Sequence, residues 1–123
     1  MTKAQKISEA EMEVMQVIWR YDDGVTSAEI LQQLNKEKSW KPTTVFTFLS
    51  RLVEKGVLKA EKRGKSNQYI PLMSENEYRC FEAKSFLNTT YKGSIKSFIA
   101  ALYEGEGISK EEIEELKNWL SKR

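Results

Sequence analysis

Short hydroxyl side chains and a single guanidinium recur at helical spacing between Pro42 and Lys55. If this stretch forms a helix, one face carries Thr43, Thr47, Ser50 and Arg51, with Thr44 and Phe46 at its margins. Ser and Thr hydroxyls bond phosphates or base edges, and the Thr methyl can contact the methyl group of thymine. The chemistry of this face therefore predicts contact with DNA. An ordinary packed helix with a small polar outer face is the alternative interpretation.

The opposite side of the same stretch predicts the helix itself. Its apolar residues fall at i, i+3, i+4, i+7 and i+8, which is the stripe of an amphipathic helix: Val45, Phe48, Leu49, Leu52 and Val53. Pro42 suits the first turn because its missing N–H has no intrahelical partner there. Gly56 follows as a stop signal. Phe46 lies angularly beside Val53, so it either completes the core edge or contacts thymine methyls.

Positive charge is concentrated around this helix. Residues 36–65 contain nine Lys and Arg and three Glu, a net charge of +6 in a chain whose net charge is +2. A basic stretch confined to one region is the electrostatic footprint of nucleic-acid binding. A solvated charged face is the alternative, because 31% of all residues are charged.

Two helices and a loop are expected to position this stretch. Residues 8–20 open with Ser8 and Glu11, a capping box, and continue with apolar residues at helical spacing. Val25 is expected to form a single strand residue or bridge. Thr26 or Ser27 caps a second helix, whose apolar side is Ala28, Ile30, Leu31 and Leu34. A polar loop then leads to Trp40, which anchors the turn into the third helix. This order is the helix-turn-helix pattern.

A β-hairpin is expected directly after the third helix. Strands over 57–62 and 68–72 flank a Gly-containing turn at 63–67, and Pro71 places the second strand at an edge or strand end. A basic hairpin in this position is the wing of a winged helix-turn-helix. Its tip residues Lys62, Arg63 and Lys65, together with Lys41, would reach phosphates. The complete predicted DNA-binding set is Lys41, Thr43, Thr44, Phe46, Thr47, Ser50, Arg51, Lys62, Arg63 and Lys65.

From Ser74 onward the chain changes character. Three short helices rich in aromatic residues are expected, the first and last opening with the capping boxes Ser74–Glu77 and Ser109–Glu112. About 50 residues form a weak core alone, so these stripes are expected to pack against a second copy of the chain. Packing back onto the winged domain in a monomer is the alternative. The predicted dimerisation residues are Tyr78, Phe81, Phe86, Leu87, Tyr91, Ile95, Phe98, Ile99, Leu102, Ile113, Leu116, Trp119 and Leu120.

The fold prediction is therefore mostly α with a small β-hairpin, with a winged helix-turn-helix DNA-binding domain over 1–73 and a helical dimerisation domain over 74–123. The absence of His and the lone Cys80 argue against an enzyme, a metal site and an intrachain disulfide. No cofactor is expected. No signal peptide and no apolar run of membrane-spanning length are found, so a cytoplasmic protein without membrane insertion is expected.

The chain resembles the penicillinase repressor family, the bacterial repressors of beta-lactamase and methicillin-resistance genes. The likeness covers nearly the whole chain. It is carried by I-S-E-A-E-M-E-V-M-Q-V-I-W at 7–19, W-K-P-T-T-V at 40–45, S-R-L-V-E-K-G at 50–56, Y-K-G-S-I-K-S at 91–97 and E-E-I-E-E-L at 111–116. The resemblance implies a homodimeric winged-helix repressor, held together by its C-terminal helices and bound to palindromic operators.

The resemblance also implies a trigger. In relatives a membrane sensor of beta-lactams triggers proteolysis of the repressor, between an Asn and a Phe. The corresponding bond here is Ala101–Leu102, a candidate proteolytic switch, and a membrane sensor-protease is a candidate partner. The sequence departs from the family there, and Phe46 stands where the resistance repressors carry a basic residue, so the operator is expected to differ. Copper-responsive relatives carry a C-terminal cysteine cluster that Cys80 alone cannot form.

Taken together, the sequence predicts a homodimeric DNA-binding transcriptional repressor that binds a palindromic operator through its third helix and wing. Thr43, Thr44, Phe46 and Thr47 are expected to face base edges, while Ser50 and Arg51 contact the backbone. A winged-helix module that binds proteins and no specific DNA sequence is the alternative. Binding to bulk DNA that falls steeply with salt distinguishes the two functions, because only phosphate contacts release counterions.

Overall fold

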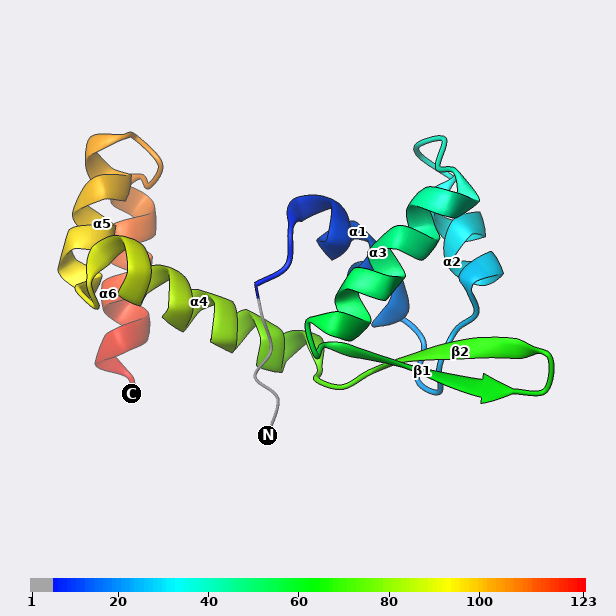
Figure 1. Cartoon of the computed structure of the whole chain (residues 1–123). Coiled ribbons are helices and arrows are strands. Elements are labelled where there is room, and N and C mark those ends of the chain that lie inside the picture. Colours follow the sequence, from blue (N-terminus) through cyan, green and yellow to red (C-terminus); the bar gives the residue numbers. More distant parts are fainter. Residues whose placement is uncertain (1–5) are drawn as a thin grey trace. The chain divides into compact units, whose positions relative to one another are not determined.

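In a computed structural model that describes residues 6–123, six helices and one two-stranded hairpin follow one another along the chain (Figure 1). The predicted class, mostly α with a small hairpin, is confirmed. The chain divides into two compact units that meet within one helix, after Arg79. We refer to residues 6–79 as the winged unit and to residues 80–123 as the helical unit.

Three helices form the body of the winged unit: α1 (Glu9–Ile18), α2 (Ser27–Leu34) and α3 (Pro42–Glu54). Ser8 and Thr26 cap the first two through reciprocal bonds with Glu11 and Glu29, as the sequence predicts for Ser8 and as one of two options at Thr26. The three helices pack against one another around a core of fully buried side chains, which includes Val14, Met15, Ile18, Ile30, Val45, Leu49 and Leu52. This core fixes which side of α3 faces outward.

The hairpin pairs β1 (Leu58–Arg63) with β2 (Ser66–Pro71) in antiparallel register, from Leu58 opposite Pro71 to Arg63 opposite Ser66. Its turn is therefore only Gly64 and Lys65, shorter than the predicted turn over 63–67. Gly64 has φ +65°, which the first central position of a type II′ turn requires. Pro71 ends β2, where its missing N–H removes no internal ladder bond.

A third short segment braces the hairpin. Val25, just before α2, forms an antiparallel bridge with Tyr69, with N···O distances of 3.2 and 2.8 Å, as the sequence predicts. Gly24 has φ +101°, and a side chain there would meet Ile70 Cγ1 at 3.1 Å. Only glycine fits both the backbone and the space at this position. The base of the hairpin is thus held against the loop that starts α2.

The helical unit is built from α5 (Ile95–Glu104), α6 (Lys110–Ser121) and most of α4 (Glu75–Tyr91). Ser74 and Ser109 cap α4 and α6 through the predicted bonds with Glu77 and Glu112. Aromatic rings join α4 to α5, with ring centroids of Phe98 lying 6.1 Å from Phe86 and 5.3 Å from Tyr91. Throughout residues 80–123, all of which the structure describes, no side chain is buried.

Three predictions about packing are wrong. Val53, expected in the buried stripe of α3, is 38% exposed because it lies at the margin of that stripe, angularly beside the exposed Phe46. Ala28, expected on the apolar side of α2, is exposed. Tyr78, expected in the dimerisation set, is fully buried in the winged unit, where its ring lies 6.1 Å from that of Trp19. Tyr78 is therefore unavailable to a second chain.

Candidate nucleic-acid interface

The outer face of α3 is open to solvent along its whole length. Thr43, Thr47, Ser50 and Arg51 are exposed and Thr44 is half-buried, as their angular positions predict. Phe46 is 50% exposed, so it does not complete the core and its ring remains available to a ligand. Since Val53 lies two turns further along, the two form an exposed apolar strip beside the hydroxyl face. The face combines small hydroxyls, one guanidinium and an aromatic ring.

Thr47 has a defined orientation on this face. Its hydroxyl donates to the carbonyl oxygen of Thr43, one turn earlier, at 2.9 Å. The hydroxyl proton is therefore engaged, while its oxygen lone pairs and its methyl group remain available. Thr47 can accept a hydrogen bond from an exposed amino group of a base, or contact a thymine methyl. Sequence periodicity placed Thr47 on the face but gave no sign of this internal bond.

The start of α3 is held by aromatic packing and not by a side-chain cap. Lys41, its N-cap residue, forms no side-chain cap bond within residues 6–123. Trp40 packs its ring edgewise on Phe48, with ring centroids 5.8 Å apart. The backbone N–H of Trp40 donates to Asn35 Oδ1 at 2.6 Å. The predicted anchoring role of Trp40 is confirmed. The Arg51 guanidinium lies over the Phe48 ring, 5.7 Å from its centroid. Arg51 is thus supported while its donors face solvent.

The cations of the hairpin differ from one another. Lys62 and Lys65 are exposed and form no ion pair among the residues that the structure describes. Arg63 donates to Glu61 Oε1 at 3.1 Å and to the Asp23 carbonyl at 3.0 Å. Arg63 thus helps to hold the hairpin, although the sequence predicts a phosphate contact like those of its neighbours. The separation of 40 residues between Arg63 and Asp23 hides this bond from local sequence patterns.

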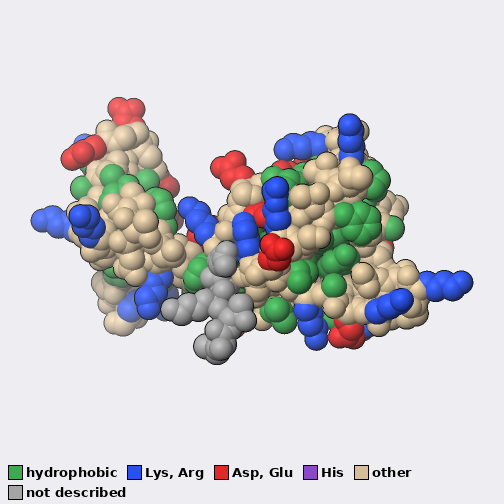
Figure 2. Space-filling view, viewed as in Figure 1, with side chains coloured by type: hydrophobic (Ala, Val, Ile, Leu, Met, Phe, Trp, Pro, Cys, Tyr) green, Lys and Arg blue, Asp and Glu red, His purple; other side chains and the backbone are tan. Residues whose placement is uncertain are grey.

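Figure 2 shows how these groups are distributed over the winged unit. Lys and Arg side chains project at the loop end of the hairpin and over the loop that precedes α3, with apolar side chains gathered between α3 and the hairpin. Cationic groups at both margins, with a face of short hydroxyls, one guanidinium and an aromatic ring between them, suit a polyanion whose groove receives the helix.

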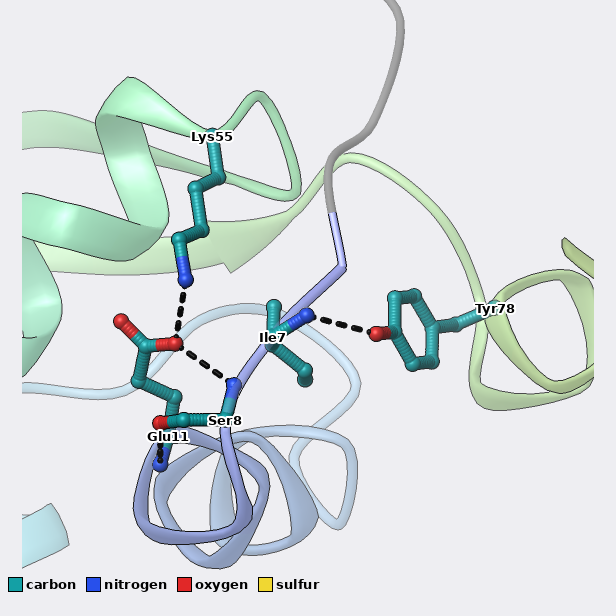
Figure 3. Close-up of polar contacts among 5 residues, drawn as sticks. All are labelled: Ile7, Ser8, Glu11, Lys55 and Tyr78. Atoms are coloured by element: carbon teal, nitrogen blue, oxygen red, sulfur yellow. Dashed lines mark hydrogen bonds and ion pairs between the residues drawn. The ribbon is translucent and has the colours of Figure 1, made fainter. Parts of the chain in front are cut away.

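The end of α3 is held by a buried ion pair that sequence analysis missed. Lys55, the C-cap residue, extends its ammonium to within 2.5 Å of Glu11 Oε1, and the Glu11 side chain is only 2% exposed (Figure 3). Burial raises the pKa of the Glu11 carboxyl, but hydrogen bonds from Lys55 and Ser8 together with the charge of Lys55 lower it more, so the pKa lies below its ordinary value. Sequence patterns assign Glu11 only to the capping box.

The predicted dimerisation residues of the helical unit, which leave out Tyr78, are half-buried or exposed. Ile95, Trp119 and Leu120 each have more than half of their accessible surface exposed. An open apolar groove of about 520 Å³ lies within this unit, lined by Lys96, Ile99, Ala100, Tyr103, Glu104 and Ile113. The Ala101–Leu102 bond lies inside α5, with Ala101 exposed and Leu102 half-buried.

Neither a metal-binding group of side chains nor a membrane-spanning helix is found in the described part of the chain. Residues 6–123 contain no group of three or more His, Cys, Asp or Glu side chains able to hold a metal ion. None of the helices described has the length and apolar character needed to cross a membrane.

Comparison of the whole sequence with known proteins agrees with the geometry. A profile of the family described as Penicillinase repressor matches residues 7–122. The penicillinase repressor of Bacillus licheniformis is 39% identical over 116 residues, which cover 94% of this chain and 90% of that protein. The methicillin resistance regulatory protein MecI of Staphylococcus aureus (strain N315) is 37% identical over 123 residues, which cover 98% of each.

Two solved structures are similar to part of the chain. The DNA binding domain of the repressor BlaI, solved in solution, is 40% identical with a TM-score of 0.56, and the match covers 63% of this chain and 94% of that one. The monomeric form of Bacillus licheniformis BlaI, solved in complex with the blaP half-operator, is likewise 40% identical, over the same shares of the two chains and with a TM-score of 0.53. The family profile and the repressors of Bacillus licheniformis and Staphylococcus aureus match nearly the whole length of this chain. The chain therefore belongs to the penicillinase repressor family.

Proposed function

We propose that this protein is a DNA-binding transcriptional repressor that acts as a homodimer on a palindromic operator. The observation that carries the proposal is the exposed, hydroxyl-lined face of α3 beside a hairpin whose Lys62 and Lys65 form no ion pair within residues 6–123. A relative of this fold, BlaI, was solved in complex with a half-operator, and its DNA-binding domain is 40% identical to this chain. Binding an operator that overlaps a promoter would repress transcription.

In this function each part of the interface has its own task. Thr43, Thr44, Phe46 and Thr47 lie in the major groove and contact base edges, while Ser50 and Arg51 contact the backbone further along α3. Lys41, Lys62 and Lys65 contact phosphates, which position the unit without reading sequence. Arg63 contributes less, because its guanidinium is already bonded to Glu61 and Asp23.

Dimerisation is assigned to the helical unit. A unit whose apolar side chains all retain exposed surface gains most by packing on an identical surface, because burial of apolar area is the main driving force for association. The dimer would place two α3 helices in successive major grooves, about 34–36 Å apart along the duplex. The helical unit also carries the Ala101–Leu102 bond, where cleavage by a membrane sensor-protease would remove the second copy and release the operator.

The test is a selection of high-affinity duplexes from random DNA, followed by affinity measurements at several salt concentrations. We expect an enriched palindrome and a log–log salt slope that corresponds to several phosphate contacts, at about 0.9 per contact. A module that binds only proteins would enrich no sequence and show a flat slope.

The orientation of Thr47 sharpens this test. Thr47→Val keeps the methyl group and removes the accepting oxygen, whereas Thr47→Ala removes both. If Thr47 accepts from a base amino group, both variants lose about 1–3 kcal/mol at the same base pair. If Thr47 contacts a thymine methyl, only Thr47→Ala loses affinity. Unchanged selected sequences with both variants would remove Thr47 from the reading face.

A further inference from the structure

The N-terminal turn over residues 7–11 contacts two elements that are far apart in the sequence. On one side, Glu11 accepts from the Lys55 ammonium at the end of α3, and also from the backbone N–H of Ser8 at 2.8 Å. Glu11 is the only charged side chain among the buried residues that the structure describes. A backbone N–H and an ammonium thus hold one carboxylate, and through it the C-cap residue of the reading helix.

On its other side, the same turn contacts the beginning of α4. The backbone N–H of Ile7 donates to the Tyr78 hydroxyl at 2.8 Å, and Tyr78 is fully buried (Figure 3). A second bond strengthens this attachment, because Trp19 Nε1 at the other end of α1 donates to the carbonyl of Met73 at 3.0 Å. The chain that enters α4 is therefore bonded to both ends of α1.

These contacts place the end of α3 and the first turn of α4 on a single short segment within the winged unit. α4 continues past Arg79 into the helical unit, so its first turn is the covalent link between the reading helix and the apolar surface assigned to dimerisation. Apolar packing tolerates small sliding movements, whereas buried hydrogen bonds with fixed directions do not. Stability alone gives little reason for a buried ion pair, since apolar residues of equal volume often serve as well.

We infer that the turn over residues 7–11 is a joint that fixes the first turn of α4, which lies in the winged unit, relative to α3, and that Glu11, Lys55 and Tyr78 are positioning residues that set which half-site spacing a dimer accepts. The inference rests on the proposed function, because half-site spacing has meaning only for a dimeric DNA-binding protein. None of the three residues contacts DNA in this assignment. Their effect is confined to how the two reading helices of a dimer are held.

The experiment compares the full-length wild type with Tyr78→Phe, which keeps the ring and removes the hydroxyl, and with Glu11→Gln, which keeps an acceptor for Ser8 and removes the charge. The probes are the palindrome selected from random DNA, its isolated half-site, and the palindrome with a few base pairs inserted between its halves. We expect both variants to keep half-site affinity and to lose at least about threefold of the discrimination between native and altered spacing, because a looser link broadens the reachable separations.

Ile18→Val is the matched control, since it removes one methyl from the same helix's core and weakens folding without touching the joint. It should leave spacing discrimination unchanged. If the control loses as much discrimination as Tyr78→Phe, the effect is general destabilisation and the inference is overturned. Equal loss on half-site and palindrome overturns it as well.

A second measurement needs no DNA. Spin labels on the exposed Cys80 and on a Lys65→Cys variant, diluted with unlabelled chain, report the distance between the hairpin and the beginning of α4. Tyr78→Phe should broaden the distance distribution, and Ile18→Val should not. An unchanged width overturns the joint even if DNA binds as proposed. A broader width in a protein that binds no duplex supports the joint and refutes the proposed function.

Discussion

The two units of this chain differ in how completely they bury their apolar side chains. The winged unit has fifteen buried apolar residues, whereas residues 80–123 have none, although their helices are equally well capped. Local signals thus determine helices equally well in both units, but only the winged unit forms a closed core within one chain. The difference indicates that the winged unit completes its core within one chain, whereas the helical unit leaves apolar surface exposed to solvent.

The largest effect is expected when one apolar side chain is truncated in each unit. Leu49→Ala, in the winged unit, should cost about 3 kcal/mol at any protein concentration, because its cavity lies wholly within one chain. Leu116→Ala, in the helical unit, should give a loss that changes with concentration, because the proposed association would contribute to its stability. Urea unfolding at low and high protein concentration measures both. A concentration-independent loss for Leu116→Ala would mean that one chain completes its own helical core.

A charge on the open surface of the helical unit should have the next largest effect. Leu120 is 55% exposed, so Leu120→Glu should leave the folded chain intact but weaken the proposed dimer roughly hundredfold, which is about 2.7 kcal/mol. Asn118→Glu adds the same charge to an exposed polar position of the same helix and should change the dissociation constant little. Sedimentation equilibrium gives the constants, and equal weakening by both variants would place the interface elsewhere.

Within the winged unit, the hairpin lysines and Arg63 should contribute differently to DNA binding. Replacing Lys62 and Lys65 with Ala should lower the log–log salt slope for DNA binding by about 1.8 for two lost phosphate contacts. Arg63→Ala should lower it by less than about 0.9, since Arg63 is bonded to Glu61 and Asp23. Fluorescence anisotropy across a salt series tests this. A larger change for Arg63→Ala would show that its internal bonds open on the duplex.

The smallest expected effect concerns acid. Because Glu11 has a lowered pKa in the folded chain, its contribution to stability is present above its unfolded pKa of about 4.3 and is lost as the pH falls through the folded value. Glu11→Gln should flatten the decline of the winged unit's urea midpoint below about pH 4. Glu61 also has a lowered pKa, owing to hydrogen bonds from Arg63 and Lys59, but it lies at the surface. Glu61→Gln is therefore the control and should change the profile less.

Most of the fold could be predicted because its signals are local. The capping boxes, Pro42 at the start of α3 and the strand end at Pro71 all follow from residue types within a few positions of each other. The face of α3 also follows from spacing, which places Thr43, Thr47 and Ser50 outside.

What the sequence could not predict depends on partners distant along the chain. Periodicity groups Tyr78 with its neighbours on α4, but its hydroxyl is bonded 71 residues away at Ile7. In the sequence Arg63 and Lys62 are equivalent cations of the hairpin, but in the fold only Arg63 is bonded to the Asp23 carbonyl. Glu11 has two roles, one in the capping box and one opposite Lys55, and only the first has a local signature.

The hairpin's brace against the loop before α2 has a consequence for protein engineering. Val25 pairs with Tyr69, Asp23 accepts from Arg63, and Gly24 leaves room for Ile70, so the wing shares its base with a segment more than thirty residues earlier. A chimera that transplants only residues 58–71 from a relative would therefore carry half of a matched set. Grafting the wing together with residues 22–25 should preserve its orientation, because the transplanted segments then carry both sides of these contacts.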